Sequence, residues 1–339
     1  MASSFAWRML AAEPSFEVQA TLMIAHGIIW GRFTKALAKR LGPWLLRQTW
    51  QKRFRERTAE MFKRSYDVEF PHADDLFEFT CLLPAILWVH FAGGLLCVPS
   101  LVWGSSAATV AMAAQGNLCE AGWELSEVAK RAAAILGLEG RRGREKNPFG
   151  LVFWMGLHHL VSLTMIVPMN ASKHRENRDY HELSFLLQFA AFVCGFAQLW
   201  GFTLDLSTAT GLARMRGAVL VASIVAWYSR AFRFAVVATR LLAAVRDAGD
   251  ERMFYGGVVG LGAMAVFNAA LVKDMSKRFY KFWSGSFLLP TPRQWNVGPA
   301  RSSPAATELH AQRLTHHDLL DEPAAARLGN DDGTLSKED

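Results

Sequence analysis

The feature that most constrains this chain is a series of long apolar runs. Five clear runs cover residues 76–103, 149–170, 182–206, 216–241 and 254–272, and a weaker one covers residues 18–34. A run of about 20 apolar residues is long enough to cross the hydrocarbon core of a bilayer as a helix. Because lipid offers no hydrogen-bond partners to the backbone, such runs must form helices. The sequence therefore predicts an all-α, polytopic membrane protein.

Basic residues lie beside the apolar runs and give the chain a net charge of +7. They are densest in residues 35–64 and recur in residues 141–146, 214–216 and 277–281. Lys and Arg concentrate in cytoplasmic loops and near anionic lipids. We therefore predict that these four segments are cytoplasmic and expect no nucleic-acid partner. Trp, Leu and Phe among the charges of the first segment are also typical of an amphipathic helix on the membrane surface.

Residues 105–136 are the candidate for a seventh span. The first two basic segments can share one side only if the chain crosses twice between them, and residues 76–103 supply one crossing. The candidate carries Glu120, Glu124 and Glu127, whose spacing places them on one helical face. Such a helix can cross if that face looks into a bundle interior or a wet cavity. We predict seven spans around a central cavity, with a surface helix as the alternative for this segment.

The chain divides into three parts. Residues 1–74 hold the weak first span and the basic segment, and residues 75–283 hold the transmembrane domain. Residues 284–339 are rich in Pro, Ser, Ala and charge, which predicts a disordered cytoplasmic tail. The four cysteines show no metal-ligand spacing, so neither a metal site nor another cofactor is predicted.

Ionisable side chains inside apolar runs are functional candidates, because they are costly in lipid. His158 and His159 are adjacent in "GLHHLVSLTM". Neighbouring helix positions diverge by about 100°, so we expect one imidazole to face the cavity and the other a neighbouring helix. The alternative is structural, with each histidine hydrogen-bonded to an adjacent helix.

Four further polar residues are candidates for the cavity wall. His90 lies in "AILWVHFAGG", and Asn268 interrupts the last run. Arg230 and Arg233 in "YSRAFRF" are three residues apart, which predicts one shared face that neutralises the glutamates or holds a lipid head group. Snorkelling of both arginines to the interface is the alternative.

The segment "LHHLVSLTM" resembles the paired-histidine segment of the TLC-domain (TRAM–Lag–CLN) superfamily. Further matches occur in the same order as in the family, over about residues 75–282. They are His90 in "ILWVHFAGG", Glu124 in "GWELSEV", Glu182 and Ser184 in "HELSF", and Asn268 and Lys277 in "VFNAALVKDMSKRFYKF". The resemblance implies a helical bundle around a lipid-sized cavity, in the endoplasmic reticulum or another endomembrane.

The ceramide synthase branch of this superfamily joins an acyl group from acyl-CoA to a sphingoid amine. It uses paired histidines and a later aspartate pair of the form HDxxD. Here the histidine pair is present, but His181 and Glu182 are followed by no second acid. The "ELS" sequence fits better with the branch that influences membrane phospholipid composition or lipid transport.

Two main functional hypotheses follow. The first is a lipid-binding protein of lipid homeostasis or transport, with membrane lipids as partners and a cavity lined by His90, Glu120, Glu124, Glu182, Arg230, Arg233 and Asn268. The second is an acyl-CoA-dependent acyltransferase in which His158 and His159 are catalytic, as general base or nucleophile. A b-type cytochrome would need His90 or His26 as a further haem ligand and would show a Soret band. A structural subunit of a membrane assembly is a fourth alternative.

Overall fold

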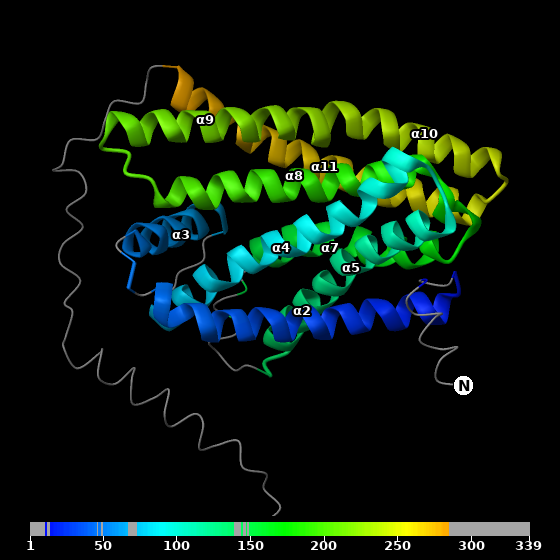
Figure 1. Ribbon diagram of the computed structural model, residues 1–339, viewed down its shortest axis with the longest axis horizontal. Helices are drawn as coiled ribbons and strands as arrows, with labels where there is room; N and C mark the ends of the chain where they lie inside the picture. Colours follow the sequence, from blue (N-terminus) through cyan, green and yellow to red (C-terminus); the bar gives the residue numbers. More distant parts are fainter. Residues whose placement is uncertain are drawn as a thin grey trace, which may run out of the picture. The chain divides into compact units, whose positions relative to one another are not determined.

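The computed structural model describes residues 11, 14–45, 47–48, 50–66, 73–138, 144, 147 and 149–284, all within one compact unit. The elements in this part are helical (Figure 1). They are α2 (Phe16–Leu45), α3 (Gln51–Tyr66), α4 (Ala73–Trp103), α5 (Ala107–Ile135), α7 (Phe149–Asn170), η1 (Lys173–Glu176), α8 (Arg178–Thr203), α9 (Ala209–Ala226), η2 (Trp227–Phe232), α10 (Arg233–Asp247) and α11 (Glu251–Trp283). The predicted tail after Ser284 and the basic residues Arg141, Arg142 and Lys146 lie outside the described residues.

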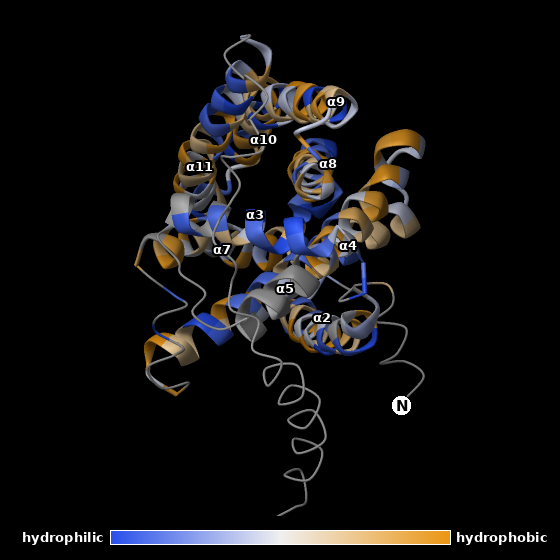
Figure 2. Cartoon of the chain, turned by 90° about the vertical axis from the view of Figure 1, so that its left-hand side faces the viewer, coloured by the Kyte–Doolittle hydropathy of each residue, from blue (hydrophilic) through white to orange (hydrophobic). Residues whose placement is uncertain are grey.

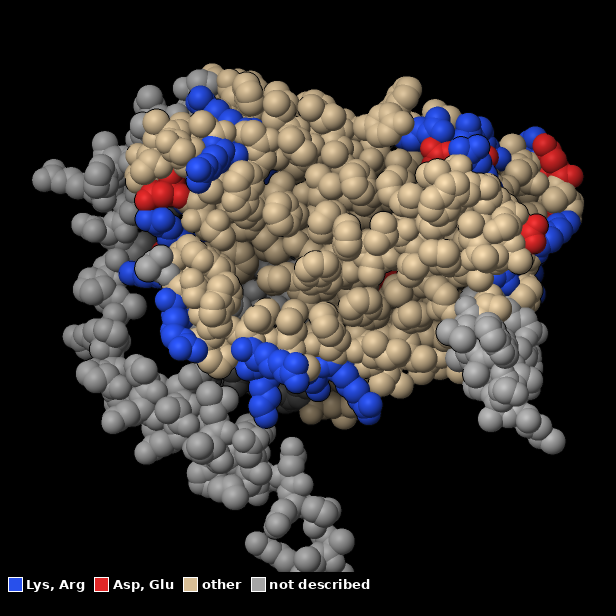
Figure 3. Space-filling model, viewed as in Figure 1, with Lys and Arg blue, Asp and Glu red and all other residues tan. Residues whose placement is uncertain are grey.

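Five helical segments in the described ranges are long and apolar enough to cross a membrane. They are Pro84–Trp103, Leu151–Asn170, Arg178–Thr203, Ala209–Asp247 and Glu251–Trp283. Charged side chains gather toward the ends and one edge of the face in Figure 3 and leave a broad uncharged area between them. The prediction of an all-α fold is confirmed for this part of the chain, and the five helices indicate an integral membrane protein.

The two weaker predicted spans fall on α2 and α5. Both helices are long, with 30 and 29 residues, but neither is among the five apolar segments. The C-terminal half of α2 carries basic residues, and α5 carries its glutamates in the middle. Seven crossings therefore stay a prediction.

Helix α5 begins with a tight connection from α4. Gly104 has a positive φ of 83°, which a residue without a side chain adopts easily, and α4 ends at the residue before it. Ser106 then caps α5, because its hydroxyl accepts the backbone N–H of Thr109 while the Thr109 side chain accepts that of Ser106. A connection this short makes consecutive helices antiparallel neighbours. Helix α5 accordingly runs back along α4, the helix with which it makes its most extensive contact.

Paired glycines bring α5 close to its neighbours α2 and α4. The three helices lie next to one another in Figure 2. A Cβ atom on Gly116 would lie 2.5 Å from the carbonyl oxygen of Gly93 in α4. A Cβ atom on Gly122 would lie 2.7 Å from the backbone nitrogen of Gly27 in α2. Small residues allow such backbone contact between membrane helices. Helix α5 is therefore held between α2 and α4, and its third large contact is with α7.

The basic helix α3 contacts the C-terminal end of α8. Arg53 forms an ion pair with Asp205, in the loop after α8. Arg57 donates a hydrogen bond of 2.9 Å to the carbonyl oxygen of Gly201, in the last turn of α8. These two contacts fix the basic segment at one end of the bundle.

We predict that Gly122→Ala destabilises the protein. The added Cβ would meet backbone atoms of α2 that cannot rotate away, so the helices must separate. Overpacking of this kind lowers the free energy of unfolding by about 1–3 kcal/mol. Thermal unfolding in detergent measures the effect. Gly31→Ala is the matched control, because a Cβ there meets no atom within 4 Å, and an equal loss in both variants would contradict the prediction.

We also predict a pH-dependent contribution from Asp205. Hydrogen bonds from the hydroxyl and backbone N–H of Ser207 lower the pKa of Asp205 below its usual 3.8, and the guanidinium groups of Arg53 and Arg57 lower it further. Because the folded pKa is depressed, the stabilisation is present above pH 3.8 and is lost as the pH falls through the lowered value.

The measurement compares the melting temperatures of wild type and Asp205→Asn. The variant should melt at a lower temperature at pH 7, and the difference should shrink below pH 3.8. Because the pair is partly exposed, the difference should be small. A difference that stays constant from pH 7 to pH 3 would show that the carboxylate charge is not involved.

Candidate functional site

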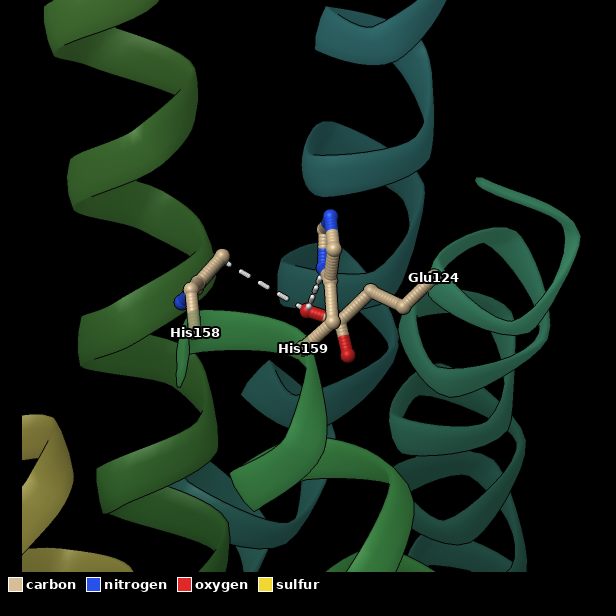
Figure 4. A group of neighbouring side chains, drawn as sticks. All are labelled: Glu124, His158 and His159. Carbon is tan, nitrogen blue, oxygen red and sulfur yellow. Dashed lines mark ion pairs between the residues drawn. The ribbon is translucent and has the colours of Figure 1, made fainter. Parts of the chain in front are cut away.

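The central group of the site consists of Glu124 from α5 and His158 and His159 from α7 (Figure 4). Nε2 of His158 lies 3.5 Å from Oε1 of Glu124, and Nδ1 of His159 lies 3.3 Å from the same oxygen. The Glu124 side chain is only 1% exposed. Both of its oxygens, and Nδ1 of both histidines, lack a hydrogen-bond partner within the described part of the chain. The three ligand atoms lie within 4.8 Å of one another, which is close enough to hold a metal ion.

The two imidazoles diverge less than their helix positions predict. His158 lines a pocket and stacks on Phe267 of α11 at a ring separation of 4.5 Å, whereas His159 faces α5. Both nevertheless reach one oxygen of Glu124, because His158 uses the distal ring nitrogen and His159 the proximal one. The angle between two neighbouring positions on a helix therefore does not by itself decide which atom their ring nitrogens approach.

A second histidine–carboxylate pair lies one turn away on α5. Nδ1 of His90, from α4, is 2.8 Å from Oε2 of Glu120, and both side chains are largely buried. Glu127 instead pairs with Lys130 and Arg131 of its own helix. The carboxylate face predicted for α5 is therefore buried against α4 and α7 at Glu120 and Glu124, and it is neutralised locally at Glu127.

Arg230 enters the site from a π-helical turn, η2, between α9 and α10. Its Nη1 donates a hydrogen bond of 3.2 Å to Oδ1 of Asn268, and its Nη2 donates one of 2.6 Å to the carbonyl oxygen of Leu187. Arg230 is 5% exposed. Its two hydrogen-bond acceptors are neutral groups, so they position the guanidinium without cancelling its charge.

The structure separates Arg230, which lines the pocket, from Arg233, which does not, although the sequence predicts one shared face. Arg233 forms an ion pair with Glu182 of α8, and Arg240 pairs with Asp179 and Glu182. A π-helical turn holds more residues than an α-helical one. It therefore changes the angle about the helix axis between positions 230 and 233. Neither Glu182 nor Arg233 lines the pocket described here, although both were predicted cavity residues.

The pocket beside these groups has an empty volume of about 860 Å³, counted to its opening. Its polar lining includes Glu120, His158 and Arg230, and the rest of its wall is mostly apolar. His90, Glu124, His159 and Asn268 lie behind this lining, where they contact the lining residues or one another.

Several lining residues were not singled out from the sequence. Gln188 and Asn117 are buried polar residues at the pocket, each with one side-chain atom that lacks a hydrogen-bond partner in the described structure. Both are polar residues within predicted spans, which is the signal that could have identified them. The contribution of Phe267, which fixes the His158 ring, had no such signal, because an aromatic residue in an apolar run is ordinary.

Comparisons with protein-family models, with curated proteins and with solved structures gave no match. The resemblance to the TLC-domain superfamily therefore rests on the sequence segments that carry it.

Proposed function

We propose that this chain is a TLC-like membrane protein that binds a lipid in the pocket beside His158 and Arg230 and acts in lipid homeostasis or transport. The observation that supports this function best is the composition of the pocket wall, which combines a buried arginine with a long apolar surface. A mostly apolar pocket with a few convergent polar groups is typical of small-molecule sites.

The polar and apolar parts of the wall follow one another along the helices. On the rod formed by η2 and α10, Arg230 is followed by Leu241 and Val245. At 1.5 Å per residue, positions 230 and 241 are about 16 Å apart. On α7 the order is the same, from His158 to Met165 and Met169. On both helices the pocket wall changes from polar to apolar in the same direction. Such a wall suits an amphiphile whose head lies near Arg230 and whose chain extends toward the α10–α11 connection.

Arg230 is the cation among the pocket-lining residues at the polar end, and it can bind an anionic head group. Arg230 is bound to neutral acceptors, whereas the carboxylate of Glu120 is occupied by His90. A guanidinium group in a water-poor pocket binds phosphate or carboxylate through charge-assisted hydrogen bonds. Membrane lipids with such head groups are therefore the expected ligands.

The contacts of α5 support seven crossings. Helix α5 returns along α4 after a tight turn, and its glutamates contact histidines of helices that are apolar enough to span. A polar helix buried in this way is protected from lipid. With α2 as the first span, the basic segments around α3 and at the end of α11 lie on the cytoplasmic side. An endomembrane location follows from the family resemblance.

We predict that Arg230→Gln reduces the amount of anionic lipid that copurifies with the protein. A hydrogen bond to a charged group contributes about 1.5–3 kcal/mol, so the loss should be about tenfold or more. Native mass spectrometry of the detergent-purified chain measures it. Arg233→Gln is the matched control, because Arg233 is three residues away, pairs with Glu182 and does not line the pocket. Equal lipid occupancy in wild type and Arg230→Gln would contradict the proposal.

We predict that Gly257→Leu shortens the acyl chains that the pocket accepts. Gly257 lines the apolar part of the pocket, and a side chain there would project toward the end of Leu242. Bound lipids identified by mass spectrometry should shift to shorter chains or lower occupancy. Gly262→Leu on the same helix is the control, since a Cβ there meets no atom within 4 Å. An unchanged chain-length distribution in Gly257→Leu would place the acyl chain elsewhere.

The acyltransferase alternative is favoured by one observation, the contact of the pocket-lining His158 with the buried Glu124. A carboxylate beside an imidazole can orient it as a general base. If the chain is such an enzyme, incubation with acyl-CoA and a sphingoid amine should give an N-acylated product that is lost in His158→Ala. The lipid-binding function predicts no product.

A further inference from the structure

Glu124, His158 and His159 form a cluster whose geometry a hydrogen-bonded ion pair does not explain. The two ring nitrogens approach Oε1 of Glu124 to 3.5 and 3.3 Å, but neither approach has the alignment of a hydrogen bond. A buried carboxylate normally accepts well-aligned hydrogen bonds, because an unsatisfied charge in a water-poor interior is costly. Here neither oxygen of Glu124 accepts a well-aligned hydrogen bond in the described structure, although the side chain is 1% exposed and both His159 and Ser162 lie close enough to interact with it.

Two distances in the cluster match the edges of a tetrahedral coordination shell. Zinc lies about 2.0–2.1 Å from imidazole nitrogen and carboxylate oxygen, so two ligand atoms of a tetrahedral site are about 3.3 Å apart. The two observed separations from Oε1 of Glu124 are 3.5 Å to His158 and 3.3 Å to His159. All three candidate ligand atoms lie within 4.8 Å of one another.

We propose that Glu124, His158 and His159 bind one Zn²⁺ ion, with its fourth coordination position open toward the lipid pocket. Two imidazoles and one carboxylate form the three-ligand set of zinc sites that keep an exchangeable position. The ion would replace the missing hydrogen bonds of Glu124 by coordination. It would also explain why two adjacent histidines converge on a single oxygen atom.

The surroundings fix the ligands and give the ion a route of entry. His158 lines the pocket, and its ring is held by stacking on Phe267 with an interplanar angle of 10°. His159 and Glu124 lie on the closed side, between α7 and the tightly packed α5. The fourth position would therefore face the pocket where His158 lines it. One Zn²⁺ with one carboxylate ligand leaves a charge of +1, which favours an anionic fourth ligand such as hydroxide or a lipid carboxylate or phosphate.

The lipid pocket and the zinc site are separate claims. The pocket proposal rests on Arg230 and the apolar wall, whereas the zinc site rests on Glu124 and the histidine pair. If zinc is bound but no lipid is, only the lipid proposal fails. If lipid copurifies in an Arg230-dependent manner but no metal binds, only the zinc proposal fails.

The experiment uses the full-length chain purified in detergent without an affinity tag that binds metals. Elemental analysis should find about one zinc per chain, and removal with a chelator followed by Co²⁺ should produce the visible absorption of a tetrahedral Co²⁺ complex. Loss of a residue that only hydrogen-bonds to a metal ligand weakens metal binding by about 10–100-fold. Glu124→Gln and His159→Ala remove ligands themselves, so each should weaken binding of Zn²⁺ by more than this. Glu124→Gln preserves the shape of the side chain, so it keeps the packing of α5.

His26→Gln is the matched control. His26 also contacts α5, through Gln115 and Cys119, but lies outside the cluster. It should retain full zinc occupancy. Wild-type protein that binds neither Zn²⁺ nor Co²⁺ at one equivalent would overturn the proposal without any variant. Equal binding in wild type and Glu124→Gln, or a spectrum typical of octahedral Co²⁺, would overturn the assigned ligands or geometry.

Discussion

The structure depends on how it satisfies the carboxylates that α5 carries into the helical bundle. A charged group in a water-poor interior persists only if a partner lies within reach. Glu120 has His90, and Glu127 has Lys130 and Arg131 of its own helix. Glu124 faces the histidine pair, but without an aligned hydrogen bond from it. Each histidine partner comes from a helix that is apolar enough to span a membrane. The polar residues on these apolar helices therefore mark where α5 must pack.

Close backbone packing makes this arrangement rigid. At Gly116 and Gly122 an added Cβ would lie within 3 Å of backbone atoms of α4 or α2. A helix packed this closely presents Glu120 and Glu124 at defined positions opposite the histidines. The same rigidity suits either of the roles proposed for the site, since both lipid recognition and metal binding need ligand groups that are held in advance.

Much of this arrangement was predictable from sequence, because the cost of polar groups in lipid does not depend on the fold. Long apolar runs gave the five apolar helices, and histidines and glutamates within predicted spans gave most of the candidate site. Glu182 and Arg233 were predicted in the cavity, yet they pair with each other outside the pocket. A π-helical turn changes the direction in which Arg233 points, and a sequence read with a regular helical period cannot detect such a turn.

The sequence by itself determined the class of protein and most of the candidate site residues, since both follow from the transfer energetics of single side chains. Only the tertiary structure decided which groups meet. It paired His90 with Glu120 rather than with Glu124, turned Arg230 inward, and brought two imidazoles to one carboxylate oxygen. These choices depend on helix rotation, glycine contacts and rotamers, which are properties of several segments packed together. No single segment of the chain contains that information.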